Sequence, residues 1–448
     1  MTRRDTPWPD HGGQAAPLLA RYGLPPDHPV LDFSANINPL GPPAWLPRRL
    51  GEALPGAVEY PDPLYREACA AIAESEGIPP DRVLLTNGGV EAVFLAAALH
   101  AGGRAAILQP TFSEYARACR HQGLPVDALR LEGKRFELDE SAARAALARC
   151  DVLFLCRPNN PTGTLIPREA LERLLAAGLE QGCTLVVDEA FIDFVMPDER
   201  LTPLLATWPN LILLRSLTKL YAIPGLRLGY LLGSAGTVAR ARARQMPWSV
   251  NHLAASLVAP LLADHGFLDR TRRWFAAEQP RLQAGLSAAG LEVIPSRANF
   301  FLVRPASEPE ATAGQSSIHM TQEPGTGRRG GHLPWVRRTP PNGLAMDGQP
   351  RSCKRSRMRE RSRANVAPGK GVMAPPRRPV DGSIQAIMPT AIALATTEAL
   401  FEHLLRSGIL ARHTRNFPGL DGGWLRLALR GRADNDRLLQ ALAAGRPG

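Results

Sequence analysis

Short apolar runs alternate with longer helical stretches between about residue 82 and residue 232, and this alternation most constrains the fold. The apolar runs lie at residues 83–85, 105–108, 152–155, 184–187, 211–214 and 228–232. Such alternation predicts a mostly parallel sheet with helices on both faces, an α/β fold. Because ligands of these sheets bind outside the carboxyl ends of the strands, side chains at those ends are the first candidates for a site.

The pattern changes after residue 250. Residues 250–290 are typical of helix, and the strand-like runs 291–294 and 299–303 begin a smaller α+β unit. A helix over 396–405, the segment 408–412, a strand over 424–429 and a helix over 435–443 complete that unit. We therefore predict an N-terminal arm and substrate loop (1–40), a large domain (41–285), a small domain (286–305 and 391–448) and a separate segment (306–390).

The segment 306–390 is rich in Pro, Gly, Ser and Arg and has little periodicity, a composition typical of disorder. Its 14 Lys and Arg against 6 Asp and Glu account for +8 of the net charge of +11. Three interpretations remain open: a functionless disordered insertion or local frame shift, a tether to nucleic acid or to another anionic surface, or a folded subdomain. We favour the first, because the segment has too few apolar residues for a core.

Cysteine usage and apolar content limit the class of protein. The six cysteines form no Cys-x-x-Cys pair, which argues against a disulfide framework and a zinc site. The N-terminus lacks the apolar stretch of a secretory signal, and no apolar run is long enough to span a bilayer. We expect a cytoplasmic protein with no metal and no membrane association.

One strand end carries a lysine, a hydroxyl group and an arginine. Ser216 and Lys219 directly follow the apolar run 211–214, and Arg227 precedes the next run. A partly desolvated lysine can form a Schiff base with an aldehyde cofactor. The hydroxyl group and the guanidinium can together hold a phosphate. Taken alone, this lysine would more often be an exposed surface residue.

Three further strand ends carry groups that suit the same cofactor. Gly88, Gly89 and Val90 open a helix, where backbone N–H groups can approach a phosphate. Asn160 can donate to a phenolate-type oxygen, although a simple turn is the commoner meaning of such a residue.

Asp188 and Tyr115 complete the set. A carboxylate at Asp188 would keep a pyridine nitrogen protonated, which gives pyridoxal phosphate (PLP) its capacity to accept electrons. Tyr115 can stack on the same ring, or belong to the core.

The order and spacing of these motifs resemble the fold-type I, PLP-dependent aminotransferase superfamily. The resemblance is carried by Asn160-Pro-Thr-Gly163, Asp188-Glu-Ala-Phe191, Ser216-x-Thr-Lys219 and Pro224-Gly-Leu-Arg227-x-Gly229, and it covers about 10–304 and 391–445. It implies a large PLP-binding domain, a smaller α+β domain, and Lys219 and Asp188 as catalytic residues.

A narrower resemblance, to the threonine-phosphate decarboxylases of cobalamin biosynthesis, is carried by His11-Gly-Gly13, Asp32-Phe-Ser-Ala-Asn36-Ile-Asn38-Pro-Leu-Gly41 and Asn416-Phe-Pro-Gly-Leu420. These enzymes are relatives of histidinol-phosphate aminotransferases. The resemblance implies a homodimer in which Tyr60 reaches the cofactor phosphate of the other subunit. It also implies that Arg426 binds the substrate carboxylate, and that the substrate phosphate is bound by Arg412, Asn36 and His11.

One position departs from the aminotransferase pattern. Aminotransferases of this type commonly have Tyr three residues after the aspartate, where this chain has Phe191. One hydrogen bond to the ring oxygen should therefore be missing, with Asn160 left as the main donor. Decarboxylase-like relatives often have Phe there, so the departure favours decarboxylation.

The resemblance leads us to expect decarboxylation of L-threonine O-3-phosphate to (R)-1-aminopropan-2-yl phosphate and CO₂. The alternative is an aminotransferase acting on a phosphorylated amino acid such as histidinol phosphate. A third hypothesis, from another class, is a PLP-binding regulator tethered to DNA by its Arg-rich segment. Regulators of that kind place a winged helix first, whereas only 31 loop-like residues precede Asp32, so we do not expect nucleic-acid binding.

Overall fold

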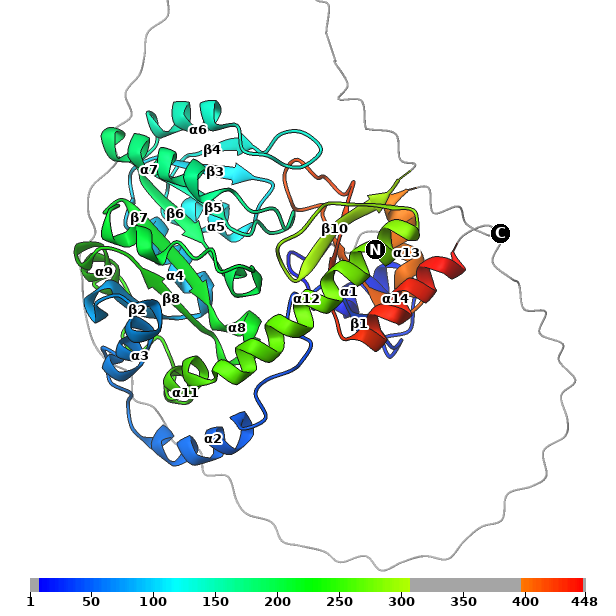
Figure 1. Cartoon of the computed structure of the whole chain (residues 1–448), viewed down its shortest axis with the longest axis horizontal. Coiled ribbons are helices and arrows are strands. Elements are labelled where there is room, and N and C mark those ends of the chain that lie inside the picture. Colours follow the sequence, from blue (N-terminus) through cyan, green and yellow to red (C-terminus); the bar gives the residue numbers. More distant parts are fainter. Residues whose placement is uncertain (1–7, 307–395, 446–448) are drawn as a thin grey trace, which may run out of the picture. The chain divides into compact units, whose positions relative to one another are not determined.

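Seven strands form the central sheet of the computed structural model, which describes residues 8–306 and 396–445 (Figure 1). Only β8 runs antiparallel to its neighbours, so the predicted mostly parallel sheet is confirmed. The strands lie in the order β2 (Val83–Asn87), β8 (Leu228–Leu232), β7 (Leu211–Ser216), β6 (Thr184–Asp188), β5 (Val152–Cys156), β3 (Ala105–Gln109) and β4 (Val126–Arg130).

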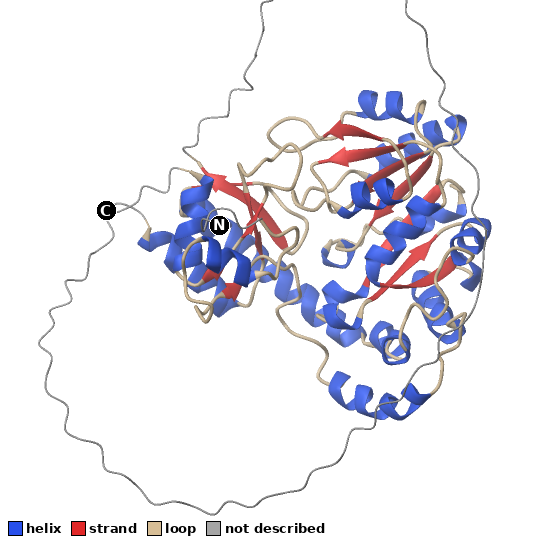
Figure 2. Cartoon of the chain, turned by 180° about the vertical axis from the view of Figure 1, so that it is seen from behind, coloured by secondary structure: helices blue, strands red, loops and turns tan. Residues whose placement is uncertain are grey.

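Helices cover both faces of this sheet, as Figures 1 and 2 show. Because side chains alternate along a strand, Leu153 and Leu155 enter the core on one face, and Val152 and Phe154 enter the core on the other. The first face packs against α3 (Arg66–Glu76), α6 (Glu140–Leu147), α7 (Arg168–Gln181) and α11 (Val258–Ala263). The second packs against α4 (Gly88–Ala98), α5 (Glu114–His121) and α9 (Ala235–Arg242).

Each apolar run predicted between residues 82 and 232 is a strand, but β4 was missed. Its sequence, Val-Asp-Ala-Leu-Arg, lies at the edge of the sheet and is only partly buried. An edge strand needs no continuous apolar run, so the pattern used to find the other strands could not reveal it. The remaining helices of this part are α2 (Leu46–Ala53), α8 (Leu217–Leu220) and α10 (His252–Ala255).

The smaller unit is built around a four-stranded antiparallel sheet. Its strands lie in the order β12 (Arg412–His413), β13 (Leu425–Ala428), β10 (Phe300–Pro305) and β9 (Leu291–Val293). Phe300 and Phe301 lie in its core with residues of α12 (His265–Ala288), α13 (Thr397–Arg406) and α14 (Arg432–Ala444). The predicted second α+β unit is therefore present.

The N-terminal residues pack against this smaller unit. Leu18 and Leu19 of α1 (Ala15–Arg21) and the neighbouring Phe33 are buried in its core, and β1 (Leu31–Asp32) pairs in parallel with β11 (Ile409–Leu410). The predicted boundary at residue 285 falls inside α12. Apart from Ala306, the predicted basic segment lies outside the described residues. No helix within 8–306 and 396–445 is long and apolar enough to cross a membrane.

Close backbone packing at the start of α4 requires glycine. Gly88 has φ +73°, and a Cβ there would lie 2.4 Å from Nη2 of Arg227. A Cβ on Gly229 of β8 would lie 2.6 Å from the backbone nitrogen of Gly89. The first turn of α4 therefore sits directly against the strand that follows Arg227, and it brings backbone N–H groups to the end of the sheet.

We predict that Gly229→Ala destabilises the protein by about 1–3 kcal/mol, because backbone atoms of α4 and β8 must separate to admit the methyl group. Urea denaturation of the cofactor-free protein measures this. Gly236→Ala in α9 is the matched control: its Cβ meets nothing within 4 Å, so stability should stay equal or rise slightly. Equal stability of the two variants would contradict the close packing.

Candidate active site

A cavity of about 430 Å³ lies where β5, β6 and β7 end and where α4 and α5 begin. The N-terminal loop and the small domain contribute further walls. Of the fourteen predicted site residues, twelve line this cavity: His11, Asn36, Gly89, Val90, Tyr115, Asn160, Asp188, Ser216, Lys219, Arg227, Arg412 and Arg426. Segments that are far apart in sequence thus meet in one site.

Gly88 and Tyr60 do not line the cavity. Gly88 lies directly behind it, where its missing side chain leaves room for the guanidinium of Arg227. Tyr60 is 81 % exposed, and its ring lies 4.7 Å from that of Trp248. Within its own chain, Tyr60 therefore does not contribute to the cavity.

Besides Arg117, which lies 3.5 Å from Glu114, four cationic side chains line the cavity: Lys219, Arg227, Arg412 and Arg426. No carboxylate in the described part of the chain forms an ion pair with any of them. Burial and the nearby guanidinium groups of Arg426 and Arg227 lower the pKa of Lys219 to about 8. Because buried charge without a counter-ion is costly, the cavity favours anionic ligands.

Asp188, with 8 % of its surface exposed, is one of two buried carboxylates that line the cavity; the other, Glu114, is 5 % exposed. Tyr115 donates from its hydroxyl group to Oδ2 at 2.6 Å, and the Ala190 backbone donates to Oδ1 at 2.9 Å. Burial raises the pKa of Asp188, while these hydrogen bonds and Lys219 act in the opposite direction. A cationic group placed beside Asp188 would therefore gain a desolvated carboxylate partner.

The hydroxyl group of Tyr115 gives this residue a role that the sequence did not indicate. The side chain is fully buried, and its ring stacks on Phe154 with the centroids 5.8 Å apart. Phe112, three residues before Tyr115, lines the cavity and is only partly buried. Phe112 is thus the aromatic side chain with the more accessible ring. Its place within Pro110-Thr-Phe-Ser-Glu-Tyr115 was the only sequence signal for it.

Asn160 and Arg426 are joined by a hydrogen bond across the two domains. Arg426 donates to Oδ1 of Asn160 and, at 2.6 Å, to the backbone oxygen of Ser34. A guanidinium can only donate, so the amide of Asn160 must present its oxygen to Arg426. Its NH₂ group then remains available as a donor. Burial and Arg412 lower the pKa of Arg426 to about 9, and its Nε has no hydrogen-bond partner among the described residues.

Arg412 holds the N-terminal loop over the cavity. It donates to the backbone oxygens of Pro9 and Asp10, at 3.1 and 2.5 Å, and to Oδ1 of Asn416 at 2.7 Å. These contacts place His11 beside the buried carboxylate of Glu114, with Nε2 and Oε1 3.1 Å apart. Much of the donor capacity of Arg412 is therefore already used within the protein.

The part of the cavity formed by the start of α4 and the end of β7 is rich in hydrogen-bond donors. Gly89 and Val90 lie in the first turn of α4, whose N-terminal N–H groups have no helical partner. The Ser216 and Thr218 hydroxyl groups lie 2.8 Å apart and close the same side. Together with Arg227, these groups form a site that suits a phosphate.

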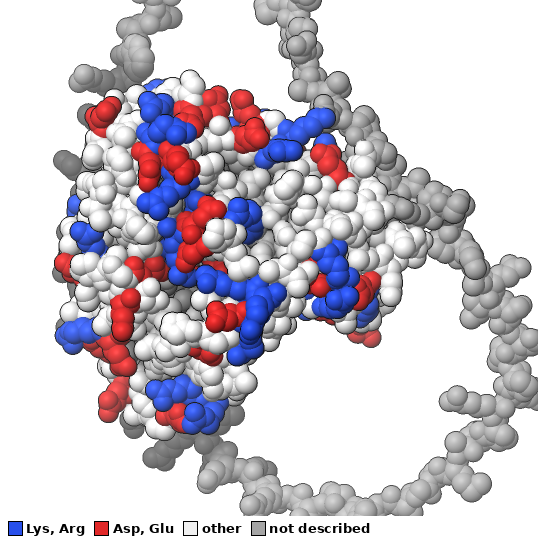
Figure 3. All heavy atoms as spheres, viewed as in Figure 1, with Lys and Arg blue, Asp and Glu red and all other residues white. Residues whose placement is uncertain are grey.

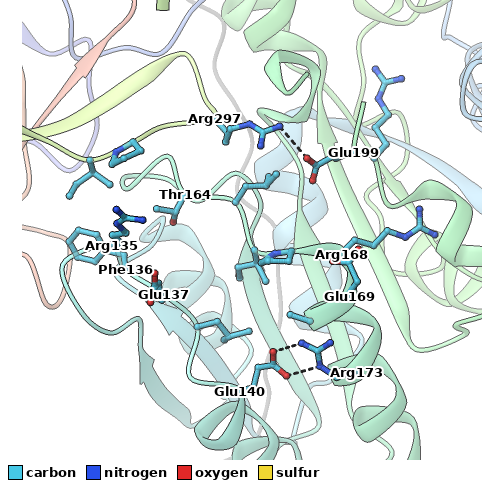
Figure 4. Close-up of a pocket in the computed structure, with 18 of the residues that line it drawn as sticks. Arg135, Phe136, Glu137, Glu140, Thr164, Arg168, Glu169, Arg173, Glu199 and Arg297 are labelled. Carbon is cyan, nitrogen blue, oxygen red and sulfur yellow. Dashed lines mark hydrogen bonds and ion pairs between the residues drawn. The ribbon is translucent and has the colours of Figure 1, made fainter. Parts of the chain in front are cut away.

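A second hollow, of about 820 Å³, contains none of the predicted site residues. It lies beside α6 and α7, and two pairs of its charged side chains form ion pairs in Figure 4. Arg173 donates from Nε to Glu140 at 2.9 Å, and Arg297 lies 3.1 Å from Glu199. Positive and negative side chains are likewise interspersed on the surface in Figure 3. Five arginines and five carboxylates line the larger hollow, so its charges balance, unlike those of the smaller cavity.

Comparison with known proteins agrees with this geometry. Residues 28–340 match the family model "Aminotransferase class I and II". The chain is 40 % identical over 297 residues to threonine-phosphate decarboxylase of Salmonella typhimurium, an alignment that covers 66 % of this chain and 81 % of that protein. It is 35 % identical over 311 residues to histidinol-phosphate aminotransferase of Sphingopyxis alaskensis, covering 66 % and 82 %.

A solved structure has the same fold. The histidinol-phosphate aminotransferase from Sinorhizobium meliloti, in complex with pyridoxal-5'-phosphate, superposes with a TM-score of 0.70 at 17 % identity, covering 99 % of this chain and 95 % of that one. The predicted fold-type I architecture is confirmed. The chain belongs to the aminotransferase class I and II family of PLP-dependent enzymes.

Proposed function

We propose that this protein decarboxylates L-threonine O-3-phosphate to (R)-1-aminopropan-2-yl phosphate and CO₂, for the assembly of cobalamin. The observation that carries the proposal is the set of four cationic side chains without carboxylate partners around one cavity. A PLP phosphate, a substrate carboxylate and a substrate phosphate would balance that charge. The similarity to threonine-phosphate decarboxylase supports this choice of substrate.

The residues present fit PLP. Gly89, Val90, Ser216 and Arg227 would hold the cofactor phosphate, and the buried carboxylate of Asp188 suits a protonated pyridine nitrogen. The NH₂ group of Asn160 would donate to the ring oxygen.

The aromatic side chains and the lysine complete this arrangement. Phe112 would cover the ring, while Tyr115 holds Asp188 in place through its hydroxyl group. Phe191 is 5 % exposed, packs edge-on against Phe300 and has no hydroxyl group to offer. Lys219 would bind the aldehyde carbon.

At the substrate end, Arg426 would take the carboxylate, and its bond to Asn160 would link substrate position to the ring. Asn36 and His11 would bind the substrate phosphate together with Arg412. The Asn36 Oδ1 atom has no partner among the described residues; the NH₂ group of this amide would donate to the phosphate, since its oxygen can only accept. Arg412 already donates hydrogen bonds to the backbone oxygens of Pro9 and Asp10. The substrate phosphate would either replace these oxygens as acceptor or accept a further hydrogen bond from Arg412.

Bound PLP supplies an acceptor for the electron pair that the departing carboxylate leaves on Cα. The protein then has three tasks. Arg426 would orient the carboxylate, and Asp188 would keep the pyridine nitrogen charged. The residues that bind the substrate phosphate would fix the substrate so that the bond from Cα to the carboxylate carbon breaks, and not the Cα–H bond. Lys219, whose pKa is lowered to about 8, supplies the neutral amine.

The alternative is transamination of a phosphorylated amino acid such as histidinol phosphate, which the similarity to histidinol-phosphate aminotransferases supports. Lys219 would then move the Cα proton as a general base. The same cofactor-binding residues serve both reactions, so the substrate must decide between them.

We predict that the purified protein with PLP releases one CO₂ per threonine phosphate without an amino acceptor. Lys219→Ala should reduce the rate by at least about 10³-fold, since the residue is both anchor and nucleophile. Headspace CO₂ and 2-oxoglutarate consumption are measured together. Release of glutamate from histidinol phosphate plus 2-oxoglutarate, without CO₂ from threonine phosphate, would contradict the decarboxylase and support the alternative.

The lowered pKa of Lys219 predicts how PLP capture by the cofactor-free protein depends on pH. The protonated amine cannot attack the aldehyde, so the rate should rise with pH around a midpoint near 8. Arg426→Met removes a charge that lowers this pKa, and it should move the midpoint to higher pH. Stopped-flow absorbance measures the rate. Arg430→Met, whose guanidinium pairs with Asp434, is the control, and an equal shift in both variants would contradict the assignment.

A homodimer is part of the proposal. Five exposed apolar side chains lie in η2 (Leu54–Val58), shortly after it, or in 246–248: Leu54, Val58, Tyr60, Met246 and Trp248. The contact between Gly56 and His252 and the ring contact of Tyr60 with Trp248 bring these segments together. A second copy of the chain would cover this surface, and Tyr60 would reach the other subunit's cofactor phosphate.

We predict that Val58→Asp, at a side chain 89 % exposed in one chain, dissociates the dimer because it places a charge in the interface. Light scattering after size exclusion gives the mass. Leu179→Asp on α7 is the control, since this side chain is 47 % exposed and lies outside the surface described above. A Val58→Asp protein with the mass of the unaltered dimer would contradict this interface.

A further inference from the structure

A cluster of buried charges lies on the sheet face opposite the cavity. Its members, the buried charge cluster, are Glu76, Arg157, Glu189 and Arg215. Their side chains are at most 4 % exposed. The mechanism described above uses none of them.

Strand alternation places this cluster directly behind the site. Along β6, Leu185 and Val187 face the core formed with α3 and α7, so Glu189 continues on that face. Asp188 is the neighbour that faces the cavity. The same alternation puts Ser216 in the cavity and Arg215 behind it. Each strand end therefore carries one residue of the site and one of the cluster.

The contacts join the three strand ends. Glu189 forms ion pairs with Arg215, 2.9 Å from Nη2, and with Arg157, 3.5 Å from Nη1. Its Oε1 atom accepts a hydrogen bond from the Leu201 backbone at 3.3 Å, and its Oε2 atom has no hydrogen-bond partner among the described residues. The Arg157 backbone N–H donates to the Asp188 carbonyl at 2.8 Å, and that of Glu189 donates to Leu214 at 2.8 Å.

Glu76 lies at one end of the cluster, and Glu199 extends it at the other. Glu76 accepts a hydrogen bond from Tyr230 at 2.6 Å and lies 3.6 Å from Arg215. Arg157 donates 2.8 Å hydrogen bonds to Ile166 and Glu199. The cluster thus continues from β5 across β6 to β7 and on to α3.

Buried ion pairs often stabilise a fold no better than apolar side chains of the same size would, because each charge loses its hydration. Their charge pairing nonetheless favours one arrangement of the side chains over others. Here that arrangement involves the residue after Asp188, which must meet a ring nitrogen, and the residue before Ser216, which lies three residues before Lys219.

We propose that Glu189, with Arg157 and Arg215, is a positioning residue that fixes Asp188 and Lys219 relative to the cofactor. This rests on the proposed role of Asp188 toward PLP. The cluster acts through Asp188 and touches neither substrate nor cofactor. It therefore sets how tightly PLP binds and how fast the bound substrate reacts, and leaves substrate binding almost unchanged.

Glu189→Gln tests the proposal, because it keeps the side-chain shape and removes the charge shared by the two arginines. The dissociation constant of PLP, from absorbance titration of the cofactor-free protein, should rise about tenfold. The kcat value should fall about tenfold, with KM within about twofold. Unchanged PLP affinity in a folded Glu189→Gln protein would overturn the proposal.

Glu278→Gln is the matched control. Glu278 is 4 % exposed, pairs with Arg281 and accepts from Asn435 at 2.8 Å, but it lies in α12 of the other unit. This variant should lose stability yet keep the PLP affinity and kcat of the unaltered protein. An equal loss of PLP affinity in both variants would mean that any buried charge has this effect, and would also overturn the proposal.

Arg215→Lys serves if Glu189→Gln does not fold. It keeps the positive charge and loses Nη2, which lies 2.9 Å from Glu189 and donates to Thr202 at 2.9 Å. PLP affinity should again weaken several-fold, and full affinity would overturn the proposal. PLP affinity distinguishes a failure of the proposed decarboxylation from a failure of the proposed positioning role. If the unaltered protein binds PLP but releases no CO₂, the decarboxylation is refuted, and the effect of Glu189→Gln on PLP affinity can still be measured.

Discussion

Unpaired positive charge is the constraint on which the site depends. Lys219, Arg227, Arg412 and Arg426 meet around one cavity, and no carboxylate in the described residues pairs with them. Buried cations are costly unless a ligand neutralises them, so the fold holds a site that gains free energy when anions bind. Asp188, one of two buried carboxylates in the cavity, is close enough to Lys219 to affect its pKa, but its hydrogen bonds come from Tyr115 and Ala190. The cavity therefore separates places for anions from one place for a cation.

The two domains supply different parts of this arrangement. The large sheet brings Asn160, Asp188 and Ser216 to one edge because β5, β6 and β7 are parallel neighbours. The small domain adds Arg412 and Arg426, and the bond from Arg426 to Asn160 joins the two parts. Behind the same edge, Glu189 links the arginines next to two of those strand ends. Charge is thus arranged on both faces of the sheet, exposed to ligand on one and enclosed on the other.

Much of this could be predicted from the sequence. Apolar runs located six of the seven strands. The positions of Lys219, Asp188 and Asn160 directly after predicted strands assigned them to one predicted site. Strand β4 was missed because an edge strand needs no continuous apolar run. The role of Tyr115 was missed because a sequence shows that an aromatic residue is near a site, but not where its hydroxyl group points. Arg157, Glu189 and Arg215 are inconspicuous in sequence, since their pairing depends on strands that only the fold makes adjacent.

A crystal structure of Lys219→Ala with PLP and threonine phosphate would test the central claim most directly, because it shows which cation holds which anion. The account predicts the cofactor phosphate at Gly89, Ser216 and Arg227, the pyridine nitrogen at Asp188, and the substrate carboxylate at Arg426. The substrate phosphate should lie toward Arg412 and Asn36. A substrate phosphate bound at Arg426, or a pyridine nitrogen directed away from Asp188, would contradict it.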